Sequence, residues 1–160
     1  MTGYKSVSAG SFHTCSVTST DDVACWGRDD NGQSSPPSGS FGSVSAGGDY
    51  SSHGHTCSVT TAGAVDCWGD DSYGQSSPPV GSYTQVSTGD LHTCAITTVG
   101  TVTCWGEDTH GQASPPAGSF MTVSAGTNVS CGITTAGAIE CWGLDLNDVD
   151  EPPAGSFMDV

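Results

Sequence analysis

Basic residues are almost missing from this chain of 160 residues, which holds only two lysines and arginines against 17 acidic residues, for a net charge of −15. The two are Lys5 and Arg28. A nucleic-acid partner is therefore excluded, because so few cations could not neutralise a run of phosphates. The same shortage argues against binding to an anionic membrane surface. Solubility at high salt or in calcium-rich surroundings is the simplest use of such a charge.

Long apolar runs and helical periodicity are missing as well. No stretch is apolar and long enough to cross a bilayer as a helix, and none repeats apolar residues every three or four positions. Hydrophobic residues make up only 34% of the chain, and 23 glycines and eight prolines interrupt it. We therefore expect an all-β chain of short strands. No single unit could bury a core alone, whereas units packed side by side could.

Recognisable catalytic motifs are also absent. The chain has no Gly-x-Ser-x-Gly elbow, no phosphate-binding glycine loop and no His-Glu-x-x-His pair. Two basic side chains leave little with which to stabilise an oxyanion or a phosphate. We expect a protein that is not an enzyme and that requires no cofactor.

What the chain does contain is one unit repeated four times. Its tryptophans, Trp26, Trp68, Trp105 and Trp142, follow one another at intervals of 42, 37 and 37 residues. A period near 40 is typical of repeats that stack or close into a ring. The repeats cover residues 4–40, 41–82, 83–119 and 120–156 of a single domain, and residues 157–160 begin a fifth. The five extra residues of the second repeat fall in segment 48–54, which we interpret as a lengthened surface loop.

Each repeat contains three predicted strands, in which Val, Ile and Thr alternate with polar residues. In the last copy they cover residues 120–124, 130–135 and 138–142. The Gly-Gln-x-Ser-Pro-Pro segment that follows them in the first three copies is either a short edge strand or a linker, because prolines cannot donate to a sheet.

Eight cysteines form four pairs whose members are ten residues apart. The pairs are Cys15 with Cys25, Cys57 with Cys67, Cys94 with Cys104, and Cys131 with Cys141. A hairpin centred on Val99 sets Cys94 directly opposite Cys104, at a spacing that a cross-strand disulfide can bridge. We therefore predict one disulfide in each repeat. Zinc bound by His-x-Cys and the second Cys is the alternative, although Val129 replaces the histidine in the fourth copy and zinc sites favour closer Cys-x-x-Cys pairs.

Disulfides form in oxidising compartments, so we expect an extracellular or cell-surface, secreted protein. No secretion signal is recognisable where Met1-Thr-Gly leads into the first repeat. We expect the chain to be a mature form or an excised segment.

The elements shared by the copies resemble a known repeat. The pattern Val-Ser-Ala-Gly-x-x-His-Thr-Cys, then Thr-Thr-x-Gly-x-Val-x-Cys-Trp-Gly, then Asp-x-x-Gly-Gln is similar to the regulator of chromosome condensation repeat. It resembles in particular the short, secreted bacterial form with a Pro-Pro-x-Gly-Ser-Phe connector, which includes the type II β-lactamase inhibitor protein. The resemblance implies a β-propeller with one short antiparallel blade per repeat, commonly about seven blades in all. It implies no single activity, because exchange factors, photoreceptors and inhibitors share the repeat.

Residues present in several copies are first interpreted as structural. The histidines of His-Thr-Cys, His13, His55 and His92, are predicted to make structural hydrogen bonds rather than to bind a metal or act as bases. The tryptophans are predicted to pack between blades rather than to stack on sugars. An aspartate three residues after each tryptophan is predicted to close an Asx-turn. These are Asp29, Asp71, Asp108 and Asp145.

The two places where the copies diverge most are the candidates for recognition. One is the insertion in the second repeat, with Asp49, Tyr50 and His53; the other is the acidic loop of the fourth, with Asp145, Asp148, Asp150 and Glu151. Calcium held by Asp145, Asp148 and Asp150 is an alternative use of that loop, because Ca²⁺ takes several oxygen ligands, although the loop lacks the EF-hand pattern.

The ends of the chain predict association. Tyr4-Lys-Ser-Val7 and Phe157-Met-Asp-Val160 hold the same position of the repeat, so both would compete for one place in a four-blade ring closed on itself. An open array has unpaired edges at both ends. We expect an incomplete ring that is completed by a homo-oligomer, a filament or further repeats of a longer chain. The predicted function is a self-associating structural scaffold; the alternative is a recognition module that binds a protein, as an inhibitor does, or a glycan through loops on one face.

Overall fold

The fold is an array of four antiparallel sheets, each built by one repeat. The computed structural model describes residues 3–144. The first sheet contains β1 (Tyr4–Ala9), β2 (His13–Thr18) and β3 (Val23–Gly27), and the second contains β4 (Ser45–Gly47), β5 (His55–Val59) and β6 (Val65–Gly69). The third contains β7 (Tyr83–Thr88), β8 (His92–Thr97) and β9 (Val102–Gly106), and the fourth contains β10 (Phe120–Ala125), β11 (Val129–Thr134) and β12 (Ile139–Gly143). The strands of each sheet lie in chain order, so the predicted four short blades are confirmed.

The segment after the third strand is a linker and not a fourth strand in each of the first three blades. Residues 34–40, which contain the first Pro-Pro pair, have no strand structure. The linker then returns to the previous blade, where the N–H of Phe41 donates to the carbonyl of Asp21 at 2.8 Å and that of Tyr83 to the carbonyl of Gly63 at 2.7 Å. Both carbonyls belong to the turn between the second and third strands. The prolines therefore occupy the connection that leads from one blade to the next.

The hairpin register places each pair of cysteines opposite each other. Cys94 pairs with Cys104 and Ile96 with Val102, as the symmetry about Val99 predicts. One disulfide crosses each blade, between Cα atoms 4.0–4.1 Å apart. The four bonds are Cys15–Cys25, Cys57–Cys67, Cys94–Cys104 and Cys131–Cys141. A bond that closes so short a loop stabilises its blade by about 2–3 kcal/mol on the chain-entropy estimate.

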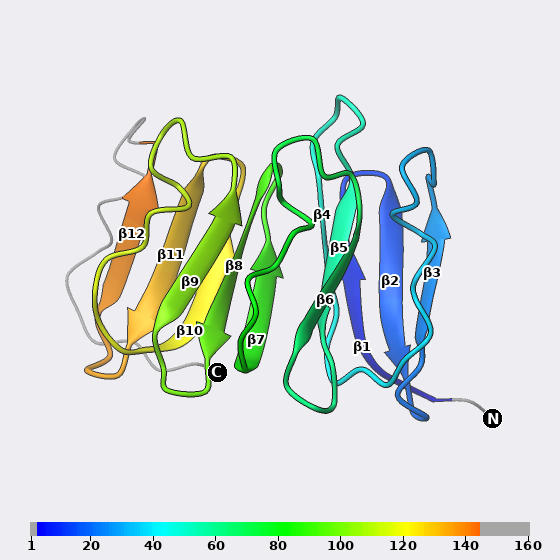
Figure 1. Cartoon of the computed structure of the whole chain (residues 1–160), viewed down its shortest axis with the longest axis horizontal. Helices are drawn as coiled ribbons and strands as arrows, with labels where there is room; N and C mark the ends of the chain where they lie inside the picture. Colours follow the sequence, from blue (N-terminus) through cyan, green and yellow to red (C-terminus); the bar gives the residue numbers. More distant parts are fainter. Residues whose placement is uncertain (1–2, 145–160) are drawn as a thin grey trace.

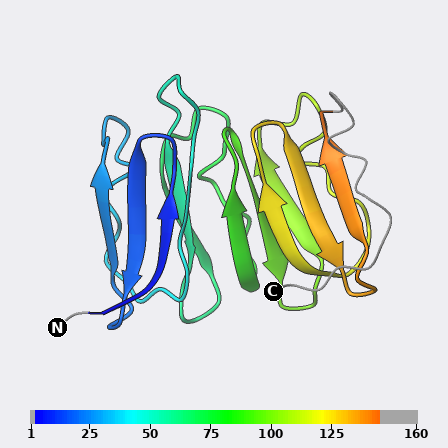
Figure 2. The same cartoon turned by 180° about the vertical axis from the view of Figure 1, so that it is seen from behind.

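The blades stand in a row, with the first and fourth sheets at opposite ends, as Figures 1 and 2 show from the two sides. None of the described residues forms a helix that could span a membrane. The repeated strand at Phe157–Val160 and the acidic loop of the fourth repeat lie outside the described residues.

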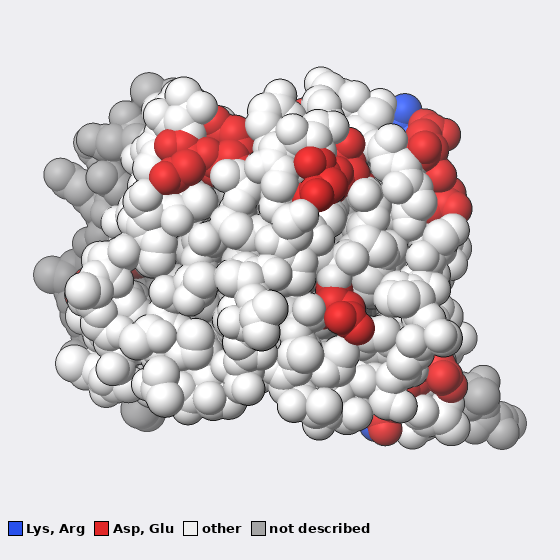
Figure 3. Space-filling view, viewed as in Figure 1, with Lys and Arg blue, Asp and Glu red and all other residues white. Residues whose placement is uncertain are grey.

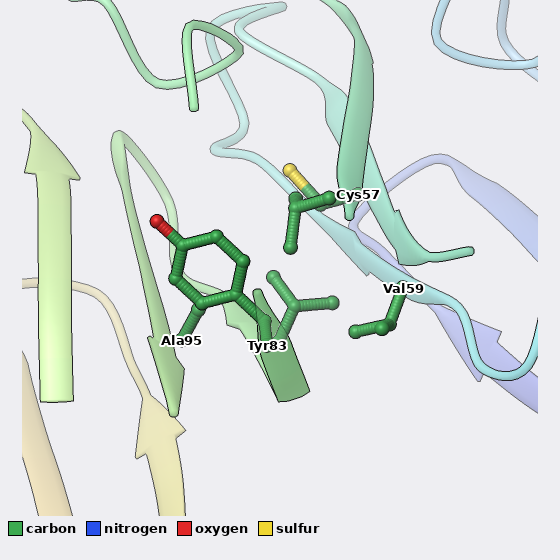
Figure 4. Close-up of a cluster of buried hydrophobic side chains, with 6 residues drawn as sticks. Cys57, Val59, Tyr83 and Ala95 are labelled. Atoms are coloured by element: carbon green, nitrogen blue, oxygen red, sulfur yellow. The ribbon is translucent and has the colours of Figure 1, made fainter. Parts of the chain in front are cut away.

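The hydrophobic core lies between the blades and not within them. One buried cluster joins Cys57, Val59 and Val65 of the second blade to Tyr83, Val86 and Ala95 of the third (Figure 4). The other two neighbouring pairs of blades share clusters built in the same way. Each internal blade therefore has a leading face, turned to the preceding blade, and a trailing face, turned to the next. An aromatic residue, Val and Trp supply the leading face; the disulfide and two β-branched residues supply the trailing one.

Candidate functional site

A backbone carbonyl joins each pair of neighbouring blades. Between the second and third blades, the carbonyl of Gln75 accepts hydrogen bonds from Thr93 Oγ1 at 3.0 Å and from Trp105 Nε1 at 2.9 Å. His55 Nε2 lies 2.9 Å from the same Thr93 hydroxyl. We call this set the inter-blade joint: the earlier blade supplies His and the Gln carbonyl, and the later blade supplies Thr and Trp.

The other two interfaces contain the same joint. The first uses His13, Gln33, Thr56 and Trp68, and the third uses His92, Gln112, Ser130 and Trp142. The distances from His Nε2 to the hydroxyl are 2.7 and 2.8 Å. These histidines therefore make structural hydrogen bonds, as predicted, and the tryptophans of the second, third and fourth blades serve inter-blade contact. The part played by the glutamine carbonyl was not predicted from the sequence.

The cysteines belong to the structure of the blades and not to a metal site. All eight are joined in disulfides, so none has a free thiolate for the zinc that the sequence left as an alternative, and that alternative is wrong. The first cysteine of the first three pairs is fully buried. The second cysteine of each pair is only partly buried, and in the first three blades it packs against the cluster shared with the next blade. These second cysteines are Cys25, Cys67, Cys104 and Cys141.

The loop that presents the carbonyl is held by its own side chains. The Gln75 side chain is fully buried, and its Oε1 accepts from the backbone N–H of Tyr73 at 2.8 Å. Asp71 accepts from the N–H of Ser76 at 2.8 Å and from the hydroxyl of Ser77 at 2.7 Å. Asp29 and Asp108 make the equivalent bonds. For these three aspartates the expected Asx-turn is therefore wrong, because each carboxylate accepts from residues five and six positions later and closes the whole loop. Asp145 lies outside the described residues.

The second acidic residue of two of these loops also points inward. Asp70 Oδ2 accepts from Gln75 Nε2 at 2.6 Å, and Glu107 accepts from Gln112 in the same way. In the first blade Arg28 holds this position and pairs with Asp30 at 2.5 Å. Figure 3 shows acidic atoms gathered along the upper edge of the molecule. Within residues 3–144, no three His, Cys, Asp or Glu side chains are grouped as metal ligands would be.

The histidines of the joint are neutral near pH 7. Burial lowers the pKa of His55 to about 4, and the neighbouring imidazoles of His92 and His13 lower it further; burial also lowers the pKa of His92 to about 4. The Thr93 hydroxyl gives its proton to the Gln75 carbonyl, so it accepts from His55 Nε2–H. The buried Nδ1 of His55 has no hydrogen-bond partner. Protonation there would bury an unpaired N–H, which is costly.

The leading face of the first blade repeats the internal chemistry but is exposed. Tyr4 and Val7 are 67% and 68% exposed, whereas Tyr83 and Val86 at the same positions of the third blade are 4% and 7% exposed. The Trp26 ring is 54% exposed. Together with Lys5, Ser6 and Ser16, these residues line a hollow of about 360 Å³. This is the space that a preceding blade would fill.

The trailing face of the fourth blade carries a smaller hollow of about 160 Å³. Ser124, Cys131, Ile133 and Ile139 contribute to its lining. Cys131, Ile133 and Ile139 correspond to Cys57, Val59 and Val65, which form the trailing side of the buried cluster in Figure 4. Val129 stands in the register of the joint histidines.

The insertion in the second repeat forms an aromatic surface against the first blade. The Tyr50 ring lies edge-on to Phe12 at 5.8 Å between centroids, and the His53 ring lies edge-on to Tyr73 at 5.6 Å. Burial alone would raise the pKa of Asp49, but hydrogen bonds from His53 and Ser51 lower it below its usual value. We call Phe12, Tyr50, His53 and Tyr73 the insertion surface. The structure brings the three predicted residues of this loop together; Phe12 and Tyr73 come from other loops and carried no sequence signal.

The second predicted recognition loop, with Asp145, Asp148, Asp150 and Glu151, lies outside the described residues, and so does the calcium site suggested there. Recognition and calcium binding by that loop stay predictions.

Comparison with known proteins identifies the repeat. The sequence profile of the regulator of chromosome condensation (RCC1) repeat matches residues 4–33 and 83–112. The structure is similar to the entire ectodomain of the receptor kinase CR4 from Physcomitrella patens, with 26% identity over 91% of this chain and a TM-score of 0.76. It is also similar to the CRINKLY WD40 ectodomain of the receptor kinase ACR4 from Arabidopsis thaliana, with 28% identity over 88% of this chain and a TM-score of 0.71. Yeast RCC1 (Prp20), solved with Kap60, shares the fold at 14% identity over 88% of this chain, with a TM-score of 0.73.

The chain spans only part of the length of these proteins: 42% of the CR4 ectodomain, 50% of the ACR4 ectodomain and 43% of the yeast protein. A search of curated proteins gives no match.

Loss of one joint hydroxyl should destabilise the array. Thr56→Val removes the acceptor of the His13 N–H and one of the donors to the Gln33 carbonyl, both in a buried site. We therefore expect the free energy of unfolding to fall by about 1–3 kcal/mol. Thr14→Val makes the same change on the half-exposed face of the first blade and should change it by less than about 0.5 kcal/mol. Urea unfolding of dilute protein measures both. Equal losses would show that the joint contributes nothing.

Stability should fall as the pH is lowered from 7.5 to 5. The folded pKa of His55 and of His92 is below the ordinary value near 6.5, so the unfolded chain takes up protons first and their contribution is lost as the pH falls below that value. At pH 5 we expect a loss of roughly 2 kcal/mol for each of these two histidines. Urea midpoints at several pH values test this, with His55→Gln, which keeps an N–H donor, as the control that should show a shallower slope. A stability independent of pH over this range would contradict the neutral, buried state of the joint.

Proposed function

We propose that this disulfide-stapled array, whose first and third repeats match the regulator of chromosome condensation (RCC1) repeat, is an extracellular, non-enzymatic scaffold whose copies associate through their end blades. The observation that carries the proposal is the exposed leading face of the first blade. Tyr4, Val7 and Trp26 have the identities of residues that are buried against a preceding blade elsewhere in the array. Such a patch on a soluble protein indicates an interaction site.

The two ends of the array complement each other. The leading face of the first blade offers aromatic rings around a hollow, and the trailing face of the fourth offers a disulfide with Ile133 and Ile139. These are the two surfaces that meet at the three internal interfaces. A head-to-tail contact of this kind closes into a ring if the rotation allows and otherwise continues as a filament. Two copies joined at both ends would make a ring of eight blades.

Extracellular location is supported by the four disulfides and by the two receptor-kinase ectodomains that the structure resembles. A non-enzymatic role is supported by the use of the recurrent polar residues. The histidines, glutamines and loop aspartates of the first three repeats are committed to hydrogen bonds that build the blades and their joints. A catalytic group needs free access to substrate, which the buried histidines lack.

Association should depend on the leading face of the first blade. We expect the wild type to sediment above 16.1 kDa in a concentration-dependent way, and more so at high salt, which screens the repulsion between acidic copies. Val7→Asp should abolish association, because it places a charge at an apolar interface. Val99→Asp, the same change at an exposed turn, should leave association unchanged. A monomer at every concentration and salt would overturn the proposal.

Recognition of a protein through the insertion surface is the second candidate function. The observation that favours it is the exposure of its aromatic rings, with Tyr50 86% exposed although it contacts Phe12. Exposed tyrosines of this kind are frequent in the energetic centre of protein interfaces.

Immobilised wild-type protein should therefore retain at least one secreted protein that Tyr50→Ala does not retain. Val80→Ala, at a fully exposed position outside this surface, is the control and should behave like the wild type. The melting temperature of all three should agree, because neither side chain is buried. Identical sets of retained proteins would contradict this second function.

A further inference from the structure

The first blade carries the later blade's half of an inter-blade joint. Thr14 lies opposite Trp26 across β2 and β3, as Thr56 lies opposite Trp68 and Thr93 opposite Trp105. Within residues 3–144, no histidine or loop carbonyl of a preceding blade faces this pair. The half-joint is therefore in register to receive a trailing face.

The fourth blade carries an altered version of the earlier blade's half. Val129 lies opposite Gly143, just as His92 lies opposite Gly106. The space for an imidazole is kept: a Cβ added to Gly89 would come within 2.6 Å of the His92 ring, and Gly126 holds that position beside Val129. At each internal joint an imidazole N–H donates to a hydroxyl of the next blade, whereas the Val129 side chain has no hydrogen-bond donor for a threonine.

Other contacts of the trailing face are present among the described residues, whereas the position of the joint carbonyl in the fourth repeat lies outside them. At the internal interfaces a serine of the first strand accepts from a backbone N–H of the next blade, as Ser8 does from Ala46 and Ser87 from Ala125, both at 3.0 Å. Ser124 occupies this position in the fourth blade and lines the hollow with Ile133 and Ile139. Apolar packing and this serine bond can therefore form without the histidine.

We infer that the fourth blade of a second copy docks on the first blade in the geometry of the internal interfaces, and that Val129 makes this joint the weakest of the assembly. The inference rests on the proposed association of copies and specifies its site. A second copy is the occupant that fits this surface. Within the array each leading face packs against a trailing face, and among the described blades only the fourth has a trailing face that no further blade covers. Joints within a chain then stay closed while joints between chains open and exchange.

The test is a double-mutant cycle on association in the full chain. Val129→His restores the imidazole and should tighten association about fivefold per joint, the effect of one net hydrogen bond. Thr14→Val should remove that gain in the double variant while changing the wild type less. Val99→His, the same substitution at an exposed turn, should leave the dissociation constant unchanged. Sedimentation over a wide range of concentrations measures all five proteins, and circular dichroism checks that each is folded.

The outcomes separate the inference from the proposed function. If the wild type associates but Val129→His does not tighten this association, the inference is wrong and the proposed association stands. The same holds if Val129→His tightens association equally in the double variant with Thr14→Val. If the wild type is monomeric and Val129→His associates through Thr14, the half-joint is right and natural self-association is wrong. If every variant is monomeric, both fail. Association that appears only after deletion of residues 157–160 would show that the chain's own duplicate strand occupies the face, and would overturn docking of a second copy.

Discussion

A carbonyl shared between two blades is the constraint on which the rest of this structure depends. A three-stranded sheet of this size has too little apolar surface to fold around itself, so its clusters of buried hydrophobic residues lie against a neighbouring blade. Two such faces can slide over each other, since apolar packing has little direction. The carbonyl of Gln75 sets the position, because Thr93 and Trp105 reach it together from the next blade. The three buried glutamines and the three buried histidines are the polar residues that this arrangement requires.

The acidic character of the chain follows partly from the same requirement. The loop that presents the carbonyl leaves several backbone N–H groups and hydroxyls to be satisfied, and a short carboxylate accepts two of them at once, as Asp71 does from Ser76 and Ser77. Asp70 and Glu107 add a bond to the buried glutamine side chain. Since each repeat brings its own carboxylates and few cations, negative charge accumulates along one edge (Figure 3). The charge is thus built into the loops before any ligand is considered.

The same residues have a different consequence at the ends of the array. Inside it, Tyr83 and Val86 complete a core; at the first blade, Tyr4 and Val7 present that core surface to solvent. A repeat protein usually covers such a surface with a capping unit of different composition. Here the first blade keeps its apolar residues and its half-joint, whereas the fourth blade exchanges one histidine for Val129. The two ends are therefore alike in packing and unlike in polar bonding, which is the difference on which the proposed weaker contact between chains rests.

The sequence by itself determined the four blades, the three strands of each blade and the pairing of the cysteines, because these depend on local spacing. Alternation sets the strands, and the symmetry of a hairpin about Val99 sets Cys94 against Cys104. It also predicted correctly that the histidines are structural. It could not identify the partner of each histidine, since Thr93 belongs to another repeat and the acceptor beyond it is a backbone carbonyl, which has no residue type to recognise. The insertion surface likewise needed the tertiary structure. Phe12 meets Tyr50 only when the first two blades pack, and Tyr73 meets His53 only when two loops of the second repeat come together. Strand pairing and cysteine pairing within a repeat follow from local residue spacing, whereas contacts between repeats depend on how the blades stack.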